Sequence, residues 1–200
     1  MSGGASPAES ASEVRVPKGF HILMPPGWRR FAADEAGRRE LTALVSERMK
    51  ALGRPELDVE ARLLIGEQWR RLRESRVDAV YLSGPSDDGV VLPASIAAAR
   101  HAAPTGSDFA TAVRSLAGVP VTEFDTPMGT VLRWDRTVPG AGDLAEVRSR
   151  QIGYGIAAPG DPRLGMIFHA AIPALDDTDA RLVEGMVELL DTIMETFRWR

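Results

Sequence analysis

Three long segments of the chain carry apolar side chains at the spacing of an α-helix. Residues 35–52 and residues 56–76 each place an apolar residue every three or four positions, and Gly53 and Pro55 separate them as stop signals. A third stripe runs through residues 178–199, where acidic residues follow the same period on what we interpret as a solvated face. We therefore predict two consecutive helices and one long C-terminal helix.

The rest of the chain alternates short extended runs with turns rich in glycine and proline. Residues 20–24 form a predicted edge or entry strand that ends at Pro25-Pro26-Gly27, and Ser107 can cap a predicted short helix over residues 108–116. The other runs are predicted to pair as an antiparallel sheet, whose last strands follow one another as a meander. They cover residues 78–83, 89–98, 119–124, 130–138, 147–157 and 164–172. The fold class is α+β: an antiparallel β-sheet meander flanked by helices, with the long C-terminal helix packed on the sheet.

The predicted register of the meander separates an apolar face from a face that carries glycines. Pairing Leu132 with Ile152, and Tyr154 with Phe168, keeps the apolar side chains together, whereas a slip by one residue inverts the faces. The apolar face then consists of Leu132, Trp134, Ile152, Tyr154, Ile156, Met166 and Phe168. The reverse face consists of Val131, Arg133, Gln151, Gly153, Gly155, Gly165, Ile167 and His169. Three glycines indicate close approach, either by a packed helix or by a partner or ligand on an open platform.

The chain is predicted to form a single α+β domain over residues 14–200, after a disordered tail over residues 1–13. The tail is small and polar, and it lacks the basic start and the apolar stretch of a secretory signal. The least polar run, residues 90–99, is well short of the roughly 20 residues needed to cross a bilayer. We therefore expect a cytoplasmic protein with no membrane partner.

Composition removes several classes of function. Lys and Arg total 24 against 28 Asp and Glu, and a net charge of −4 provides no general basic field to hold nucleic acid. The absence of cysteine excludes disulfides, thiol nucleophiles and iron–sulfur clusters. His21, His101 and His169 lie far apart in the sequence and outside any H-x-x-x-H pattern. We expect no metal, no cofactor and no catalytic residue; enzymatic activity stays open, but a protein that is not an enzyme is favoured.

Arginine and histidine side chains are the candidate partner-binding residues, because arginine dominates many interface energies. The candidates are Arg70, Arg73, Arg133, Arg136, Arg148 and His169. Arg70 and Arg73 lie at the basic end of the helix over residues 56–76, although this charge order also stabilises the helix itself. Arg136 and Arg148 are expected near one hairpin tip, where an arginine stacked on a tryptophan within the fold is the alternative. Arg133 and His169 border the predicted platform.

Two short motifs at the ends of the predicted domain resemble a known family. They are Phe20-His21-Ile22-Leu23-Met24-Pro25-Pro26-Gly27-Trp28 and Leu190-Asp191-Thr192-Ile193-Met194-Glu195-Thr196-Phe197. Together with the order of strand, turn, helices, meander and C-terminal helix, they resemble the PsbP-like family, which includes Ran-binding Mog proteins. The resemblance covers residues 14–200 by architecture and implies a binding or assembly module; it carries over no functional residue.

The sequence predicts a bacterial, cytoplasmic protein that works as a protein–protein interaction or accessory module. Its interface would be the sheet surface or the arginine-rich end of the helix over residues 56–76. The alternative is a small-molecule-binding protein or enzyme with a pocket between the sheet and the helices over residues 35–76. A third hypothesis is a homo-oligomer that pairs through a self-complementary sheet face.

Overall fold

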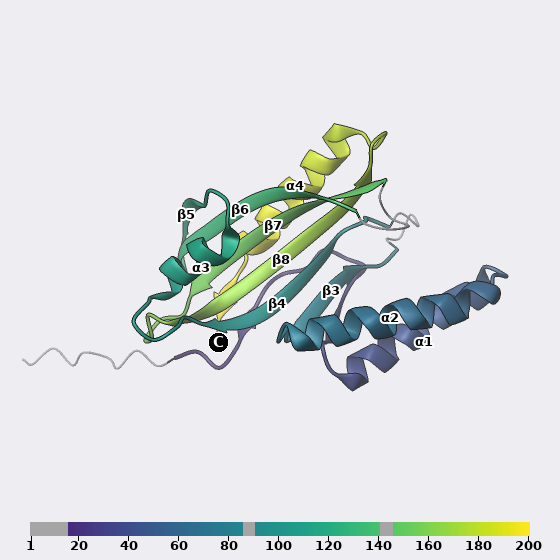
Figure 1. The fold of residues 1–200 in the computed structure, drawn as a ribbon, viewed down its shortest axis with the longest axis horizontal. Helices are drawn as coiled ribbons and strands as arrows, with labels where there is room; N and C mark the ends of the chain where they lie inside the picture. The colour runs from purple at the N-terminus through teal and green to yellow at the C-terminus, as the bar shows by residue number, and fades with distance from the viewer. Residues whose placement is uncertain (1–15, 86–90, 141–145) are drawn as a thin grey trace, which may run out of the picture.

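The fold is built on one seven-stranded antiparallel sheet (Figure 1). The computed structural model describes residues 16–85, 91–140 and 146–200, so the predicted tail and the first two residues of the predicted strand 89–98 lie outside the described residues. The strands are β2 (Trp28–Ala32), β3 (Ala79–Ser83), β4 (Ser95–Ala102), β5 (Thr122–Thr126), β6 (Gly129–Pro139), β7 (Val147–Ala157) and β8 (Leu164–Leu175). Their order across the sheet is β2-β3-β4-β8-β7-β6-β5, so β5 to β8 form the predicted meander.

Helices lie on both faces of this sheet (Figure 1). They are α1 (Glu35–Ala51), α2 (Glu56–Glu74), α3 (Phe109–Ala117) and α4 (Ala180–Glu195). α4 packs on one face, here called the α4 face, and α3 packs over β6 and β7 on the opposite face, here called the α3 face. α1 and α2 form a hairpin that contacts β2 and extends beyond the sheet. The α+β class and the C-terminal helix packed on the sheet are confirmed.

Each face of the sheet has its own apolar core. The larger core lies under α4, where Ile152, Phe168 and Leu190 are buried. The smaller core lies under α3, where Phe109 packs with Leu132. Because both faces are covered, neighbouring residues of one strand are buried on opposite sides.

This two-sided burial explains why the predicted register of β6 is wrong. Leu132 pairs with Gly155 rather than with Ile152, whereas Tyr154 pairs with Phe168 as predicted. The slip is three residues, an odd number, so it exchanges the two faces of β6. Leu132 and Trp134 therefore lie on the α3 face, and Val131 and Arg133 lie on the α4 face.

Aspartate side chains cap the N-termini of α1 and α3. Oδ1 of Asp34 accepts a hydrogen bond from the Gly37 amide at 2.9 Å, and Oδ1 of Asp108 accepts one from the Thr111 amide at 2.7 Å. The cap of α3 is thus Asp108, and the prediction of Ser107 is wrong by one position. The Ser107 hydroxyl instead donates to the Asp108 carbonyl oxygen.

α4 ends at Glu195, before the predicted end at Trp199. The chain then turns back to form β9 (Arg198–Trp199), which pairs with β1 (Phe20–His21) in a separate two-stranded sheet. The Phe20 ring stacks on Phe197 with centroids 5.8 Å apart. The predicted edge strand 20–24 is therefore real but shorter, and it joins the C-terminal segment instead of the main sheet.

One edge strand of the main sheet is β2, which the sequence pattern does not predict. Arg29 and Arg30 interrupt the apolar pattern of this strand, yet Phe31 is buried and pairs with Val80. β4 begins later than predicted and continues to Ala102, because it pairs with β8 along its whole length.

Candidate functional site

The predicted glycine-rich face is covered by α3 where two of its glycines lie. A Cβ atom added to Gly165 would lie 2.4 Å from Cε2 of Phe109, and one added to Gly155 would lie 3.1 Å from Cγ1 of Val113. Phe109 and Val113 are buried residues of α3. The packed-helix interpretation of the glycines is therefore confirmed at these positions.

Beside α3, the same face carries a small polar cluster. Gly153 leaves room for the ring of Trp134, which meets the His169 imidazole edge-on with centroids 5.6 Å apart. Nε of Arg136 donates to Oε1 of Gln151 at 3.1 Å. Desolvation against the sheet and then the charge of Arg136 lower the pKa of His169, although this residue keeps exposed surface. The structure thus brings Arg136, Gln151 and His169 to one face.

Arg133 lies on the other face and is not a platform residue, which corrects its predicted position. Its Nε donates to Oδ1 of Asp191 in α4 at 2.8 Å, and the Tyr154 hydroxyl donates to the same oxygen at 2.7 Å. Burial alone would lower the pKa of Arg133, but the hydrogen bond and charge of Asp191 raise it overall. Arg133 therefore joins the sheet to α4 as part of the fold.

A second arginine joins the sheet to α4 in the same way. Arg150 donates from Nε and Nη2 to the carboxylate of Asp135 and from Nη1 to Oε1 of Glu184. The bond to Asp135 is the main reason that the pKa of Arg150 is raised. The acidic stripe of α4 is thus only partly solvated, because Glu184 and Asp191 bind arginines of the sheet.

The other predicted arginines lie apart from one another. Arg148 pairs with Asp176 at 3.0 Å and shares the α4 side of β7 with Arg150, whereas Arg136 faces the α3 side. The expected pairing of Arg136 with Arg148 at a hairpin tip is therefore not formed. Arg70 and Arg73 are exposed on α2, as the sequence suggests.

An apolar groove of about 390 Å³ lies between α1 and the sheet strands β2 and β3. Its apolar residues are Phe31, Leu41, Leu44, Val45, Met49, Leu82 and Val91, and we call it the α1 groove. Arg29 and Arg48 are its charged residues, and Arg29 pairs with Glu40 at 2.9 Å. The groove occupies the place that the alternative hypothesis gave to a pocket, between the sheet and the helices over residues 35–76.

Exposed leucines also lie on the hairpin outside the groove. Leu52 is 54% exposed and follows Leu41, Leu44 and Arg48 on the same helical stripe. Leu63 on α2 is 71% exposed. The periodicity of residues 35–52 signals this stripe in the sequence, but it does not show that the sheet leaves part of it uncovered.

The hairpin is also the basic part of an acidic protein. Residues 35–76 contain ten arginines and lysines against eight acids, whereas the whole chain has a net charge of −4. A second hollow, formed by α1 and Arg62 of α2, is lined by Arg38, Arg39, Lys50 and Arg62, with Glu47 as its acidic residue. A partner of the hairpin would therefore meet apolar and positively charged surface together.

Within residues 16–85, 91–140 and 146–200, the structure places no three His, Asp or Glu side chains where they could hold a metal ion. No helix in this described part of the chain is long and apolar enough to cross a membrane. Comparisons with protein-family models, curated proteins and solved structures find no match to this chain.

Proposed function

We propose that this chain is a protein–protein interaction module, and that its α1 groove holds an apolar segment of a partner protein flanked by acidic residues. The carrying observation is an apolar groove that is open to the surface and whose helical stripe on α1 leads to the exposed Leu52. Exposed apolar patches on soluble proteins commonly mark interaction sites. The resemblance to the PsbP-like family stays a prediction, and it implies a role of the same kind.

Charge favours an acidic partner segment. Arg48 lines the groove, and no carboxylate lies within 4 Å of its guanidinium among the residues the structure describes. The neighbouring hollow adds Arg39 and Lys50, which are exposed. Acidic residues that flank an apolar segment would meet these cations and speed association.

A small apolar ligand is the second candidate for the α1 groove. The volume of about 390 Å³ falls in the range of small-molecule sites, which typically measure roughly 300–1,000 Å³. Such sites also contain a few convergent polar groups that orient the ligand. The lining here offers chiefly two arginines, and one of them is already paired with Glu40, so a partner segment fits better.

The test is affinity purification of the wild-type protein and of two double variants, in which the replaced residues have equal exposed fractions. Val91 lines the groove and is 53% exposed, and Leu52, which follows the groove residues on the stripe of α1, is 54% exposed. Leu116 and Leu175 are 52% and 53% exposed elsewhere. A partner that co-purifies with the wild-type protein should be lost in Leu52→Glu with Val91→Glu and retained in Leu116→Glu with Leu175→Glu. The direct measurement is calorimetric titration with the apolar, acidic segment of that partner.

Equal binding by both double variants would contradict the α1 groove as the interface. Binding lost instead in Arg70→Glu with Arg73→Glu, at an unchanged melting temperature, would place it at the basic end of α2. A small molecule retained in native mass spectrometry would favour the second candidate. Light scattering that shows a concentration-dependent dimer, lost with Leu52→Glu, would make a second copy the partner.

A further inference from the structure

The helix α2 exposes an apolar stripe on its outer side. Val59 is 66% exposed and Leu63 is 71% exposed, and the two residues lie one helical turn apart on the same side of α2. A different side of α2 holds the hairpin together: Trp69 is buried, and Asp58 accepts a hydrogen bond from the Ser46 hydroxyl of α1. The outer side is therefore available to another molecule.

Gly66 continues this side of the helix one turn after Leu63. A Cβ atom added to Gly66 would meet nothing within 4 Å, whereas one added to Gly37 in α1 would lie 2.0 Å from the carbonyl oxygen of Ala32. Packing within the chain thus requires the glycine of α1 but not the glycine of α2. A flat position beside two exposed apolar side chains lets another molecule approach the helix closely. We call Val59, Leu63 and Gly66 the α2 stripe.

Acidic side chains border the α2 stripe. Glu60 and Glu67 lie beside it on one flank, and both are exposed. On the other flank, Arg62 is already paired with Asp58 at 2.8 Å. No cation lies within 4 Å of the Glu60 carboxylate among the described residues. The α2 stripe is thus an apolar segment with acidic charge beside it, which is the kind of segment proposed for the α1 groove.

The α1 groove has the complementary chemistry. Its lining is largely apolar and includes Arg48, whose guanidinium has no carboxylate within 4 Å among the described residues. Figure 1 shows that the hairpin of α1 and α2 extends beyond the sheet, so that α2 can reach a second molecule. One chain therefore carries both an open apolar groove with a cation and an exposed apolar stripe with acids.

We propose that the α1 groove of one copy holds the α2 stripe of a second copy of this chain. The inference rests on the proposed function, because it names the segment that occupies the same groove. Val59 and Leu63 enter the groove, and the acidic flank of the stripe faces Arg48. Each copy contributes one groove and one stripe, so a two-fold axis forms both contacts at once and closes the dimer.

Charge disfavours the pairing of two α2 stripes with each other. An antiparallel pair related by a two-fold axis brings the same flank of both helices together, so Glu60 and Glu67 would meet their own copies. A parallel pair would bring Arg70, which follows Gly66 along the stripe, against its own copy. Like charges in contact weaken association, whereas the groove offers a cation to the acidic flank.

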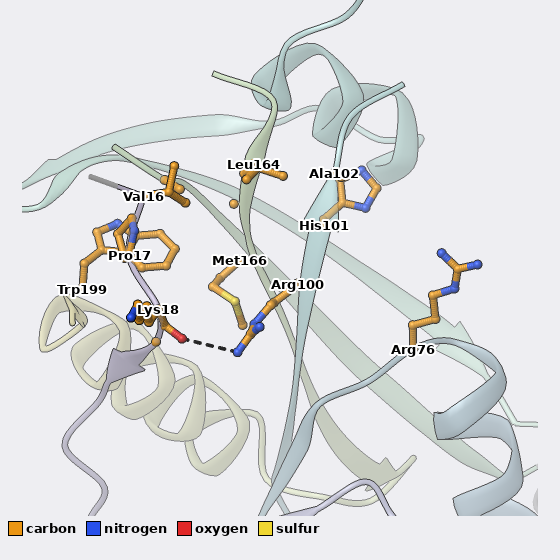
Figure 2. Close-up of a pocket in the computed structure, with 13 residues that line it drawn as sticks. Val16, Pro17, Lys18, Arg76, Arg100, His101, Ala102, Leu164, Met166 and Trp199 are labelled. Atoms are coloured by element: carbon orange, nitrogen blue, oxygen red, sulfur yellow. Dashed lines mark hydrogen bonds between the residues drawn. The ribbon is translucent and has the colours of Figure 1, made fainter. Parts of the chain in front are cut away.

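The pocket beside residues 16–19 also carries positive charge, but its cations do not converge. Figure 2 shows the side chains of Arg76 and Arg100 pointing away from each other. Nη2 of Arg100 donates to the carbonyl oxygen of Lys18 at 3.5 Å, and its Nε lies 3.9 Å from Oδ2 of Asp78. This pocket measures about 230 Å³, against about 390 Å³ for the α1 groove. The α1 groove therefore fits the apolar side chains of the α2 stripe better.

Light scattering of the full chain over a series of concentrations measures the dimer. We expect the wild type to pass from monomer to dimer, and Val59→Glu with Leu63→Glu to raise the dissociation constant at least about tenfold. Leu64→Glu is the matched control, because Leu64 is 54% exposed and lies about 100° further around the same helix. This control should dimerise like the wild type. The melting temperatures should agree, because every replaced residue is exposed.

Engineered cysteines locate the contact, because the natural chain contains no cysteine. The variants Leu63→Cys and Val91→Cys, mixed in equal amounts with oxidised glutathione, should form a disulfide-linked pair, since Val91 lines the groove. Neither variant alone should link to itself at this rate. Leu64→Cys mixed with Val91→Cys is the control and should link more slowly.

A wild-type protein that stays monomeric up to its solubility limit would overturn this inference, while the proposed function would keep its own test by affinity purification. A dimer that persists in Val59→Glu with Leu63→Glu, or rapid linkage of Leu63→Cys with itself, would also overturn the inference. A dimer that is lost in this α2 variant but kept in Leu52→Glu with Val91→Glu would exclude the α1 groove as the contact of the stripe. The two proposals therefore fail separately.

Discussion

The hydroxyl of Tyr154 in β7 donates a 2.7 Å hydrogen bond to Oδ1 of Asp191 in α4. The same oxygen accepts from Nε of Arg133 at 2.8 Å, so one carboxylate joins two strands to the helix. Burial, and then the hydrogen bond and charge of Asp191, raise the pKa of Tyr154, which keeps the phenol protonated as a donor. This contact fixes the position of α4 on the sheet.

Replacing Asp191 should therefore destabilise the fold more than replacing a neighbouring acid. Asp191→Ala leaves the partly buried Arg133 and the Tyr154 hydroxyl without their acceptor, and we expect a loss of about 2–3 kcal/mol in the free energy of unfolding. Glu188→Ala, on the exposed side of α4, should stay within about 0.5 kcal/mol of the wild type. Urea denaturation measures both, and equal losses would contradict this role of Asp191.

Two glycines should respond oppositely to alanine. Gly165→Ala places a Cβ 2.4 Å from Phe109 and 2.6 Å from the backbone oxygen of Ile156, so the free energy of unfolding should fall by about 1–3 kcal/mol. Gly185→Ala lies in α4 with nothing within 4 Å of the new Cβ, and it should gain about 0.5–1 kcal/mol. Thermal or urea unfolding of the two variants gives the sign directly, and a stabilised Gly165→Ala would show that α3 does not press on β8.

Trp69 should hold the helical hairpin to the sheet edge. Its ring is buried, and its Nε1 donates to the carbonyl oxygen of Asp34 at 2.8 Å. Trp69→Ala removes both interactions, at a cost of about 3–5 kcal/mol for a large buried side chain. Hydrogen exchange should become faster in α1 and α2 while the amides of β7 and β8 stay protected. Leu64→Ala, at an exposed position of α2, is the control and should leave exchange unchanged.

The attachment of α3 should weaken in acid. The backbone amide and then the hydroxyl of Thr111 hold the pKa of Asp108 below its ordinary value near 3.8. Folding therefore favours the ionised carboxylate, so its contribution is present above about pH 4 and is lost as the pH falls through the lower folded value. Amide exchange in α3 between pH 5 and pH 2 measures this loss.

Asp108→Asn keeps an oxygen acceptor for the cap but cannot titrate in this range. The acid-dependent change in α3 should therefore become smaller in this variant. An unchanged pH dependence would assign the effect to other carboxylates.

The elements of this fold could be predicted where a single period dominates the sequence. The stripes of α1, α2 and α4 and the extended runs of β6 to β8 give the architecture, because each helix carries one apolar stripe and each strand is a run bounded by turns. The register of β6 could not be predicted by the same reasoning. Val131 and Leu132 are consecutive and both buried, so no choice of one apolar face describes a sheet covered on both sides.

The positions of the candidate sites could not be predicted, because they depend on how distant segments pack and pair. The leucines of α1 predicted a helix, and only the packing on β2 shows which part of the apolar stripe the sheet leaves open. The incorrect register predicted for β6 placed Arg133 on the face with the glycines, whereas it lies on the α4 face.

The central position of β8 governs the order in which this protein can fold. β2 to β4 pair with one another, β5 to β8 pair with one another, and only the ladder between β4 and β8 joins the two groups. β4 therefore presents an unpaired edge until a segment more than sixty residues later in the chain has been synthesised. Pairings this distant in sequence form slowly, and open edges promote association with other chains. We therefore expect the formation of this ladder to decide whether a newly made chain completes the sheet or aggregates.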